Sequence, residues 1–254
     1  MRLGVLGCAG GSAPGLPLSC YLIDDTVAID AGALTTSLAL PQQRALTDLL
    51  LTHGHLDHVW TVPLLLANRF GPGCGTFTIH GSAFTLETIK KHLFNDRIWP
   101  DFTGARIDDQ PLVRFEALEA GATRRLATGH EVTTVALDHV VPCQGYLVRK
   151  GGSSVLVLGD TASTDAAWRL ADQQPDLAAI VVECSFTDDL QDLARKSKHL
   201  TPRLLLESLP RLRSQARVLV THLKPGYEDG IARALSAAGD PRLGLLQPGQ
   251  ALGL

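Results

Sequence analysis

The sequence has 254 residues, of which 45% are hydrophobic, and it carries a formal net charge of -3. A chain of this length can bury a sizeable core, either as one large domain or as two small halves that share a layer. The slightly acidic balance argues against a generally basic nucleic-acid-binding protein. No apolar run approaches the ~20 residues that a membrane-spanning helix needs, so we expect no membrane partner.

The five cysteines indicate a reducing compartment. Their number is odd and none belongs to a close pair such as Cys-x-x-Cys, which argues against structural disulfides and structural zinc. The apolar stretch between Arg2 and Cys8 is too short for an export signal and is predicted to form the first strand. We therefore expect a cytoplasmic protein.

The chain is predicted to begin with strands and turns. The expected elements are a strand at 3–6, a glycine-rich loop at 7–15, a hairpin of strands 20–23 and 26–29 that ends in Asp30-Ala31-Gly32, and a helical segment at 35–46. The glycine-rich loop lacks the Lys-Ser/Thr of a P-loop, and no helix follows it. We therefore assign it to a turn or a substrate loop, not to a nucleotide cofactor.

The remainder mixes strands with helices. Strands are expected at 76–80, 113–118, 132–137, 146–148, 155–158, 179–182 and 218–220, and helices at 59–68, 84–94, 165–173, 190–196, 201–209 and 228–238. An aromatic, proline-containing loop at 95–102 is long enough to form a pocket wall as well as to pack in the core. This mixture of hairpins and strand–helix alternation favours two sheets covered by helices.

Two short internal similarities suggest a repeat. The hairpin ending in Asp30 resembles the hairpin ending in Asp160, and Leu50-Leu-Thr-His53 resembles Leu219-Val-Thr-His222. We therefore expect residues 1–254 to form a single domain of two pseudo-repeated halves. The predicted fold is of the mixed α/β (α+β) class, an αββα sandwich with its functional site at the seam between the halves.

The densest motif is Asp48-Leu-Leu-Leu-Thr-His53-Gly-His55-Leu-Asp57-His58, in which an apolar strand runs into three histidines and an aspartate. His53 and His55 would lie on the same side of an extended chain, where both could bind one ion. Asp57 and His58 would start the next helix and could bind a second ion. The alternatives are a histidine-rich surface loop and a helix capped by Asp57, and the strand directly before the motif disfavours both.

Three further candidates, His139, Asp160 and His222, each follow a strand-like run. Taken singly, each has an ordinary explanation as a buried structural histidine or a helix cap. Together with the motif they make five histidines and two aspartates at or just after strand ends. Such a set is sufficient to hold and bridge two divalent ions.

These residues resemble the pattern of the metallo-β-lactamase superfamily over essentially the whole chain: His-x-His-x-Asp-His, then a lone His, a lone Asp and a lone His. The resemblance implies a four-layer αββα metallo-β-lactamase sandwich, a hydrolase, with two divalent metal ions as cofactors. It implies one ion held by His53, His55 and His139, another by Asp57, His58 and His222, and a bridge by Asp160. A set of His and Asp suits Zn, Mn or Fe.

Segments outside this set are similar to the class II 3′,5′-cyclic-nucleotide phosphodiesterases. They are His92 to Phe102, Glu183 to Phe186, His199 to Pro202, Leu204 to Glu207 and Thr221 to Pro225. The similarity implies cleavage of the 3′ phosphoester bond of cAMP or cGMP, giving a 5′-nucleotide. The chain departs from the family after His58, where Val59-Trp60-Thr61 replaces a small or glycine-containing step.

The same similarity implies roles for individual side chains. Asp57, His199 and Glu183 form the expected catalytic group: His199 donates the leaving-group proton or binds phosphate, and Glu183 orients it. Lys224 adds positive charge toward the phosphate, and Trp99 or Phe102 stacks on the base. The alternative is a purely structural role for each of them: a histidine that caps a helix, a glutamate in a buried salt bridge, a solvated lysine, and aromatic rings packed in the core.

Three other functions stay open. Residues 139–146 and 183–186 also resemble tRNA 3′-processing endonucleases. Residues 161–198, however, lack the basic, Gly/Pro-rich arm that a polyanionic substrate would need. The lack of this arm disfavours a nucleic-acid partner. The same ligands would support hydrolysis of a lactone or thioester. A metal-holding sensor without turnover would need a defective site, and no ligand is missing. Preference between cAMP and cGMP and the number of subunits stay open, a homodimer included.

Overall fold

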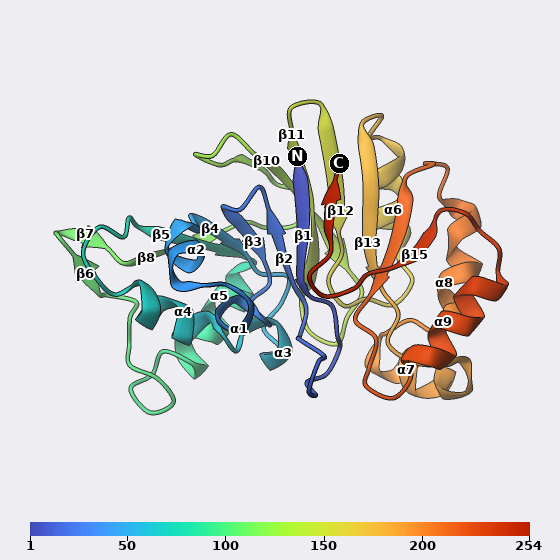
Figure 1. Ribbon diagram of the computed structural model, residues 1–254, viewed down its shortest axis with the longest axis horizontal. Coiled ribbons are helices and arrows are strands. Elements are labelled where there is room, and N and C mark those ends of the chain that lie inside the picture. Colours follow the sequence, from blue (N-terminus) through green and yellow to red (C-terminus); the bar gives the residue numbers. More distant parts are fainter.

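Two seven-stranded sheets lie face to face in the computed structural model, which describes residues 1–254 (Figure 1). In the first sheet, β1, β2 and β3 are antiparallel, and β3, β4, β5 and β8 are parallel. Its order is β16 (Ala251–Gly253), β1 (Arg2–Gly7), β2 (Cys20–Ile23), β3 (Val27–Ile29), β4 (Asp48–Leu50), β5 (Phe77–Gly81) and β8 (Val113–Ala117).

The second sheet has a similar pattern, with an antiparallel hairpin β11–β12 followed by the parallel strands β13, β14 and β15. Its order is β15 (Leu243–Leu245), β14 (Arg217–Thr221), β13 (Leu177–Glu183), β12 (Ser153–Val157), β11 (Cys143–Lys150), β10 (Glu131–Leu137) and β9 (Thr123–Arg125). A small separate pair is formed by β6 (Arg106–Ile107) and β7 (Gln110–Pro111).

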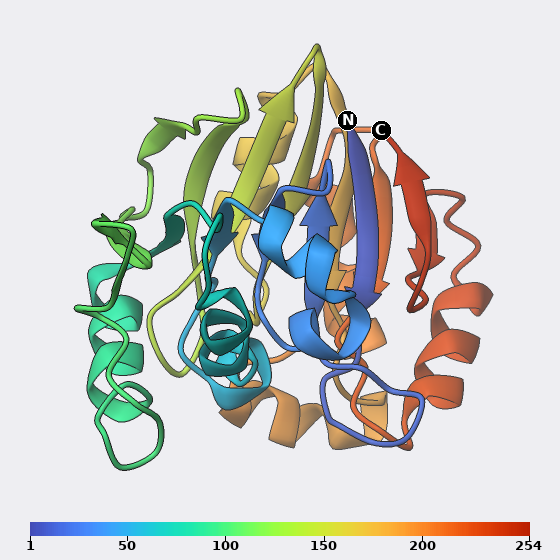
Figure 2. The same cartoon turned by 60° about the vertical axis from the view of Figure 1, so that its left-hand side comes forward.

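Helices cover the outer face of each sheet (Figures 1 and 2). The first sheet carries α1 (Leu34–Ser37), α2 (Leu40–Ala45), α4 (Val62–Arg69) and α5 (Ala83–His92), and the second carries α6 (Asp165–Asp172), α8 (Pro202–Ser208) and α9 (Glu228–Ala237). Two helices, α3 (Leu56–Val59) and α7 (Gln191–Ser197), lie at the lower edge of the sandwich in Figure 1. The predicted mixed α/β, four-layer αββα sandwich is confirmed. No helix is long and apolar enough to cross a membrane.

Three apolar layers hold the sandwich together. The middle layer lies between the sheets, where Ile29 and Leu50 of the first sheet meet Val157 and Val181 of the second. The outer layers join each sheet to its helices. Strand residues buried on both faces explain the near-continuous Val/Ile/Leu runs in the sequence, because parallel strands covered on both sides have no solvated face.

Most predicted elements are present, and the errors have local causes. The helix expected at 59–68 is broken after α3, because the backbone N–H and hydroxyl of Thr61 both donate to the carbonyl of Ala31. Pro63 then lies in the first turn of α4, a position that suits a residue without an N–H. The strand before the histidine motif was predicted too long, since β4 ends at Leu50. The three-residue strands β15 and β16 were not predicted.

The internal similarities fall differently on the two sheets. The hairpins ending before Asp30 and Asp160 are β2–β3 and β11–β12, which occupy equivalent places at the start of a parallel run. The two Thr-His pairs do not occupy equivalent places. Thr52-His53 follows β4, which is the direct neighbour of the hairpin β2–β3, whereas His222 follows β14, which is separated from the hairpin β11–β12 by β13. A single domain of two pseudo-repeated halves stays a prediction, supported by the hairpins.

Tyr146 ties the second sheet to the segment that follows β4. Its buried hydroxyl donates to the carbonyl of Leu51 at 2.6 Å and accepts from the side-chain amide of Gln144 at 2.7 Å. The backbone N–H of Gln144 donates in turn to the carbonyl of Thr52 at 3.1 Å. These contacts hold the chain leading to His53 against the opposite sheet.

Tyr146→Phe should lower the free energy of unfolding by about 1–3 kcal/mol, because it leaves the carbonyl of Leu51 and the amide of Gln144 buried without this partner. Urea unfolding followed by circular dichroism measures the change. The matched control is Tyr227→Phe, which removes a hydroxyl that has no hydrogen-bond partner in the protein and should cost less than about 0.5 kcal/mol. Equal effects of the two substitutions would contradict the role of the Tyr146 hydroxyl.

Candidate metal centre

The ligand-type residues predicted from the sequence converge at one edge of the sandwich, beyond the ends of strands from both sheets. His53 follows β4, His139 follows β10, Asp160 follows β12 and His222 follows β14. The backbone leaves the sheets here, so side chains from segments far apart in sequence can meet. The sequence predicted a site at the seam between the two halves, and the structure brings ligand-type side chains that follow strands of both sheets to this edge.

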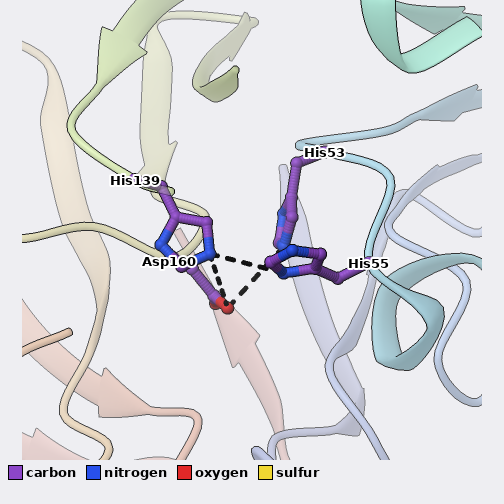
Figure 3. A group of neighbouring side chains, drawn as sticks. All are labelled: His53, His55, His139 and Asp160. Carbon is purple, nitrogen blue, oxygen red and sulfur yellow. Dashed lines mark hydrogen bonds and ion pairs between the residues drawn. The ribbon is translucent and has the colours of Figure 1, made fainter. Parts of the chain in front are cut away.

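The first group contains His53, His55, His139 and Asp160 (Figure 3). Asp160 Oδ2 lies 3.7 Å from His53 Nε2 and 3.9 Å from His139 Nε2. His139 Nε2 lies 3.4 Å from His55 Nδ1. One candidate ligand atom from each residue lies within 4.8 Å of all the others, so the four could surround one ion.

The second group contains Asp57, His58 and His222 and faces the other oxygen of Asp160. Asp160 Oδ1 lies 3.4 Å from both His58 Nε2 and His222 Nε2. Asp57 Oδ2 lies 3.9 Å from His58 Nε2 and 3.8 Å from His222 Nε2. The two oxygens of one buried carboxylate therefore point toward different groups, as a bridging ligand requires.

The donor atoms of both groups fit a divalent metal. Nε2 of His53, of His58 and of His222 are buried and have no hydrogen-bond partner in the protein. Leaving three such nitrogens unpaired is costly, and a metal ion would satisfy them. Imidazole and carboxylate donors without thiolates suit Zn, Mn or Fe.

The electrostatics favour the ligand form of most of these side chains. Burial and neighbouring imidazoles hold the pKa of His53 well below its usual value, and burial lowers the pKa of His222 to about 4. Burial opposes ionisation of Asp160, but His222 and His58 outweigh it and hold the pKa of that carboxyl well below its usual range. Burial also lowers the pKa of His55 and His139. These shifts favour the neutral imidazoles and the ionised Asp160 carboxylate that metal ligation requires.

His58 is the exception. Burial lowers its pKa, but the carboxylates of Asp160 and Asp30 outweigh burial and raise the pKa well above its usual value. Ligation of a metal requires the neutral imidazole, so an ion at this group would compete with the proton that the two carboxylates favour.

The nitrogens that face away from the centre have partners that fix the rings. Asp30 Oδ2 accepts from His58 Nδ1 at 2.7 Å, and Asp30 also accepts from the backbone N–H and hydroxyl of Thr52. The Thr52 hydroxyl lies 3.0 Å from His53 Nδ1, and Ser19 Oγ lies 2.9 Å from His222 Nδ1. His139 Nδ1 lies 3.2 Å from the carbonyl of Lys198. Such contacts set the ring orientation and tautomer of metal-binding histidines.

His199 and Glu183 form a buried pair at the edge of the centre. His199 Nδ1 lies 2.7 Å from Glu183 Oε1, and the other carboxylate oxygen accepts from the hydroxyl of Ser185 at 2.8 Å. A ring nitrogen of His199 lies within 4.8 Å of donor atoms of Asp160 and His222. Burial lowers the pKa of His199, but the Glu183 carboxylate outweighs it and raises the pKa. The helix-cap alternative is excluded, because Thr201 caps α8.

Lys224 lies beside the second group, whereas the two predicted stacking rings do not. Lys224 Nζ is 3.9 Å from Asp57 Oδ2 and donates to the carbonyl of Gly10. Phe102 stacks on Phe70 with ring centroids 6.0 Å apart, and it packs with Trp99 against the outer core of the first sheet. Their segment, between α5 and β6, lies at the left-hand end of Figure 1, away from α3. Base stacking on these rings stays a prediction.

Sequence reasoning missed the positioning role of Asp30. The residue is buried, has a φ of +57° and lies directly after β3. The sequence feature that could have pointed to Asp30 is the similarity of the two hairpins, because Asp30 occupies the position in the first hairpin that Asp160 occupies in the second. Thr52 and Ser19 had no comparable signal, because their partners come from distant parts of the chain.

Comparison with known proteins assigns the chain to a family. A probable 3′,5′-cyclic-nucleotide phosphodiesterase of Yersinia pestis is 28% identical over an alignment of 280 positions, gaps included, that covers 89% of this chain and 78% of that protein. A 3′,5′-cyclic-nucleotide phosphodiesterase of Schizosaccharomyces pombe is 28% identical over 79% of this chain but only 63% of its own length. A ribonuclease Z of Bradyrhizobium is 28% identical over 62% of this chain.

Solved structures agree on the fold. The crystal structure of unliganded yeast PDE1 has a TM-score of 0.83 at 20% identity and covers 100% of this chain and 99% of its own. The metallo-β-lactamase fold protein YhfI of Bacillus subtilis has a TM-score of 0.78 at 18% identity, covering 99% of each chain. The predicted metallo-β-lactamase fold is thereby confirmed. Because the sequence model of the cAMP phosphodiesterases class-II matches residues 33–229, more than half of the chain, the protein belongs to this family of enzymes.

Proposed function

We propose that the protein hydrolyses the 3′ phosphoester bond of 3′,5′-cyclic nucleotides, cAMP or cGMP, at a centre of two divalent metal ions. The observation that carries the proposal is the position of Asp160, whose two oxygens face two separate groups of ligand-type side chains. Membership of the class-II family supports the substrate class. A cyclic nucleotide is small enough to reach a centre formed by loops at one edge of the sandwich.

In this proposal His53, His55 and His139 hold one ion, Asp57, His58 and His222 hold the other, and Asp160 bridges them. Two such ions supply a nucleophile by lowering the pKa of water and stabilise charge on the phosphate oxygens. The residues around the ligands keep the imidazoles in place: Asp30 and Thr52 on one side, and Ser19 on the other. Zn, Mn and Fe remain alternatives for the ions.

His199 is the proposed proton donor to the leaving 3′ oxygen. Its Nδ1 is engaged by Glu183, so a proton on the remaining ring nitrogen is available toward the centre. Glu183 is in turn held by Ser185 and by the backbone N–H of Thr161 at 3.0 Å, which makes it a positioning residue for the imidazole. Lys224 is proposed to add positive charge near the phosphate.

A tRNA 3′-processing activity is the second candidate, supported by the likeness to ribonuclease Z. Residues 161–198 argue against it, because α6, β13 and α7 occupy most of this region, where a basic arm would be expected. We propose a cytoplasmic location on the ground that all five cysteines are free. A homodimer stays open.

Purified protein supplied with Mn²⁺ or Zn²⁺ should convert cAMP or cGMP to the 5′-nucleotide, with no 3′-nucleotide formed. Chromatography of the products distinguishes the two, and a precursor tRNA and a lactone are assayed in parallel. Folded, metal-loaded protein that cleaves the tRNA or the lactone but no cyclic nucleotide would refute the proposal.

The two-ion centre makes a stoichiometric prediction. His139→Ala removes a ligand from the first group only and His222→Ala from the second group only, so each variant should retain about one tightly bound ion where the wild type retains two. Elemental analysis after dialysis against a weak chelator measures the ratio of metal to protein. Loss of both ions from both variants, or one ion in the wild type, would contradict two separable sites.

Proton donation by His199 should matter only for a leaving group that must be protonated as it departs. His199→Gln should lower kcat for cAMP by about 10²- to 10⁴-fold, because the 3′ alkoxide must be protonated as it leaves. Hydrolysis of bis(p-nitrophenyl) phosphate should fall far less, since nitrophenolate leaves without a proton. Bound metal serves as the control and should be unchanged. Equal losses on both substrates would indicate phosphate binding by His199 in place of proton donation.

A further inference from the structure

The glycine-rich loop, residues 7–15, packs along the segment that carries His222. The loop leaves β1 at the lower edge of the sandwich in Figure 1, where α3 and α7 also lie. Ala9 of the loop pairs with Leu223 in an isolated parallel bridge, one residue after His222. The first and the last part of the chain therefore meet beside the second group of ligand-type residues.

Hydrogen bonds fix this contact. The backbone N–H of His222 donates to the carbonyl of Cys8 at 2.7 Å, and the N–H of Gly10 donates to the carbonyl of Leu223 at 2.9 Å. The carbonyl of His222 accepts from the hydroxyl of Ser185 at 3.2 Å. The loop cannot move away from His222 without breaking the first two bonds, and the third restrains the same residue at its carbonyl.

The loop approaches His222 most closely at Gly10. A Cβ added at Gly10 would lie 2.5 Å from the carbonyl oxygen of His222, 2.8 Å from Cδ2 of its ring and 3.0 Å from Nε2. Nε2 is the ligand-type nitrogen of this ring and lies 3.4 Å from Asp160 Oδ1. Separations this short leave no room for a side chain, so only glycine lets the loop lie against the ligand edge of the imidazole.

The backbone of His222 depends on the same surroundings. Its φ of +62° is in the left-handed region, which a residue with a Cβ adopts only where its neighbours impose it. The bond to the carbonyl of Cys8 and the bond from Ser185 supply that constraint. A shift of the loop would therefore move the backbone of His222 as well as its ring.

Gly10 also contacts the lysine beside the second group. Its carbonyl accepts from Lys224 Nζ at 2.6 Å. Lys224 Nζ and His222 Nε2 lie 3.9 Å and 3.8 Å from the same oxygen, Asp57 Oδ2. One residue of the loop thus touches both an imidazole and an ammonium group that face Asp57.

We propose that Gly10 is a positioning residue for the second ligand group, and that it holds the His222 ring where this group can bind an ion. The inference rests on the proposed function for the two-ion centre, but it concerns ion binding and not the substrate. No hydrogen bond joins the loop to the histidines of the first group. A side chain at position 10 should therefore weaken the second group and spare the first.

The first test measures ion binding. Gly10→Ala should weaken one of the two ions by about 10- to 100-fold and leave the other unchanged, as expected when the support of a metal-binding histidine is lost. Competition of the Zn²⁺-loaded protein with a chromophoric chelator measures both affinities. Unchanged affinities in Gly10→Ala, or equal weakening of both ions, would overturn the proposal.

Gly15→Ala is the matched control. It strains the same loop, because Gly15 has a φ of +80°, but no atom beyond its chain neighbours lies within 4 Å of the added Cβ. Its unfolding midpoint should fall while both ion affinities stay at the wild-type values. A loss of ion binding in Gly15→Ala equal to that in Gly10→Ala would overturn the proposal, because it would reflect general disturbance of the loop.

The second test identifies the group that is affected. In a His139→Ala background the second group is intact, and Gly10→Ala should weaken the remaining ion by about 10- to 100-fold. In a His222→Ala background the remaining ion is held by the first group, and Gly10→Ala should leave its affinity unchanged. Equal effects in the two backgrounds would contradict a role for Gly10 at the second group.

A measurement on the wild type decides the question if Gly10→Ala does not fold. The amide resonance of Gly10 should shift when a chelator removes one of the two ions, and the resonance of Gly15 should not. A Gly10 resonance that responds to neither ion would overturn the proposal. Two bound ions with the expected selective loss, in a protein that cleaves no cyclic nucleotide, would refute the proposed substrate and leave the role of Gly10 standing.

Discussion

The hydrogen bonds of the Asp30 carboxylate are the interaction on which the candidate metal centre depends. This buried group accepts from His58 Nδ1 and from the backbone N–H and hydroxyl of Thr52, and Thr52 in turn contacts His53 Nδ1. Burial of a carboxylate costs free energy unless it is paired and hydrogen-bonded, so Asp30 depends on these donors. His58 and Thr52 in turn depend on Asp30 for their orientation. One acidic side chain therefore orients an imidazole in each of the two ligand groups.

The fold makes this arrangement by placing an aspartate after the second strand of each hairpin. Asp30 follows β3 and contacts His58 on the side of the ring that faces away from the centre, whereas Asp160 follows β12 and lies between the two ligand groups. The Tyr146 hydroxyl, bonded to the carbonyl of Leu51, fixes the distance between the two sheets close to the centre. Folding stability and ligand geometry are thus coupled through the same short segment after β4.

Those parts of the site with a dense local motif could be predicted from the sequence. Residues 53–58 combine four ligand-type residues in six positions, and strand-like runs before His139, Asp160 and His222 indicated that they would meet. The predicted strand was nevertheless too long, because β4 ends at Leu50 and His53 and His55 lie in the segment after it. Contacts such as Ser19 with His222 span 203 residues and leave no local pattern. The same lack of local information explains why the short strands β15 and β16 escaped prediction.

Substrate selection depends on residues other than the ligands. The superfamily pattern carries the hydrolytic chemistry, and it is shared by proteins that differ in substrate. In this chain the segment that departs from the expected family step, Val59-Trp60-Thr61, comes directly after His58 of the second ligand group. An RNA chain would bring additional phosphates to the surface around the centre, and residues 161–198 provide no basic arm to bind them. A single cyclic nucleotide needs only one phosphate position. The lack of a basic arm in this region therefore supports the small substrate proposed for the centre.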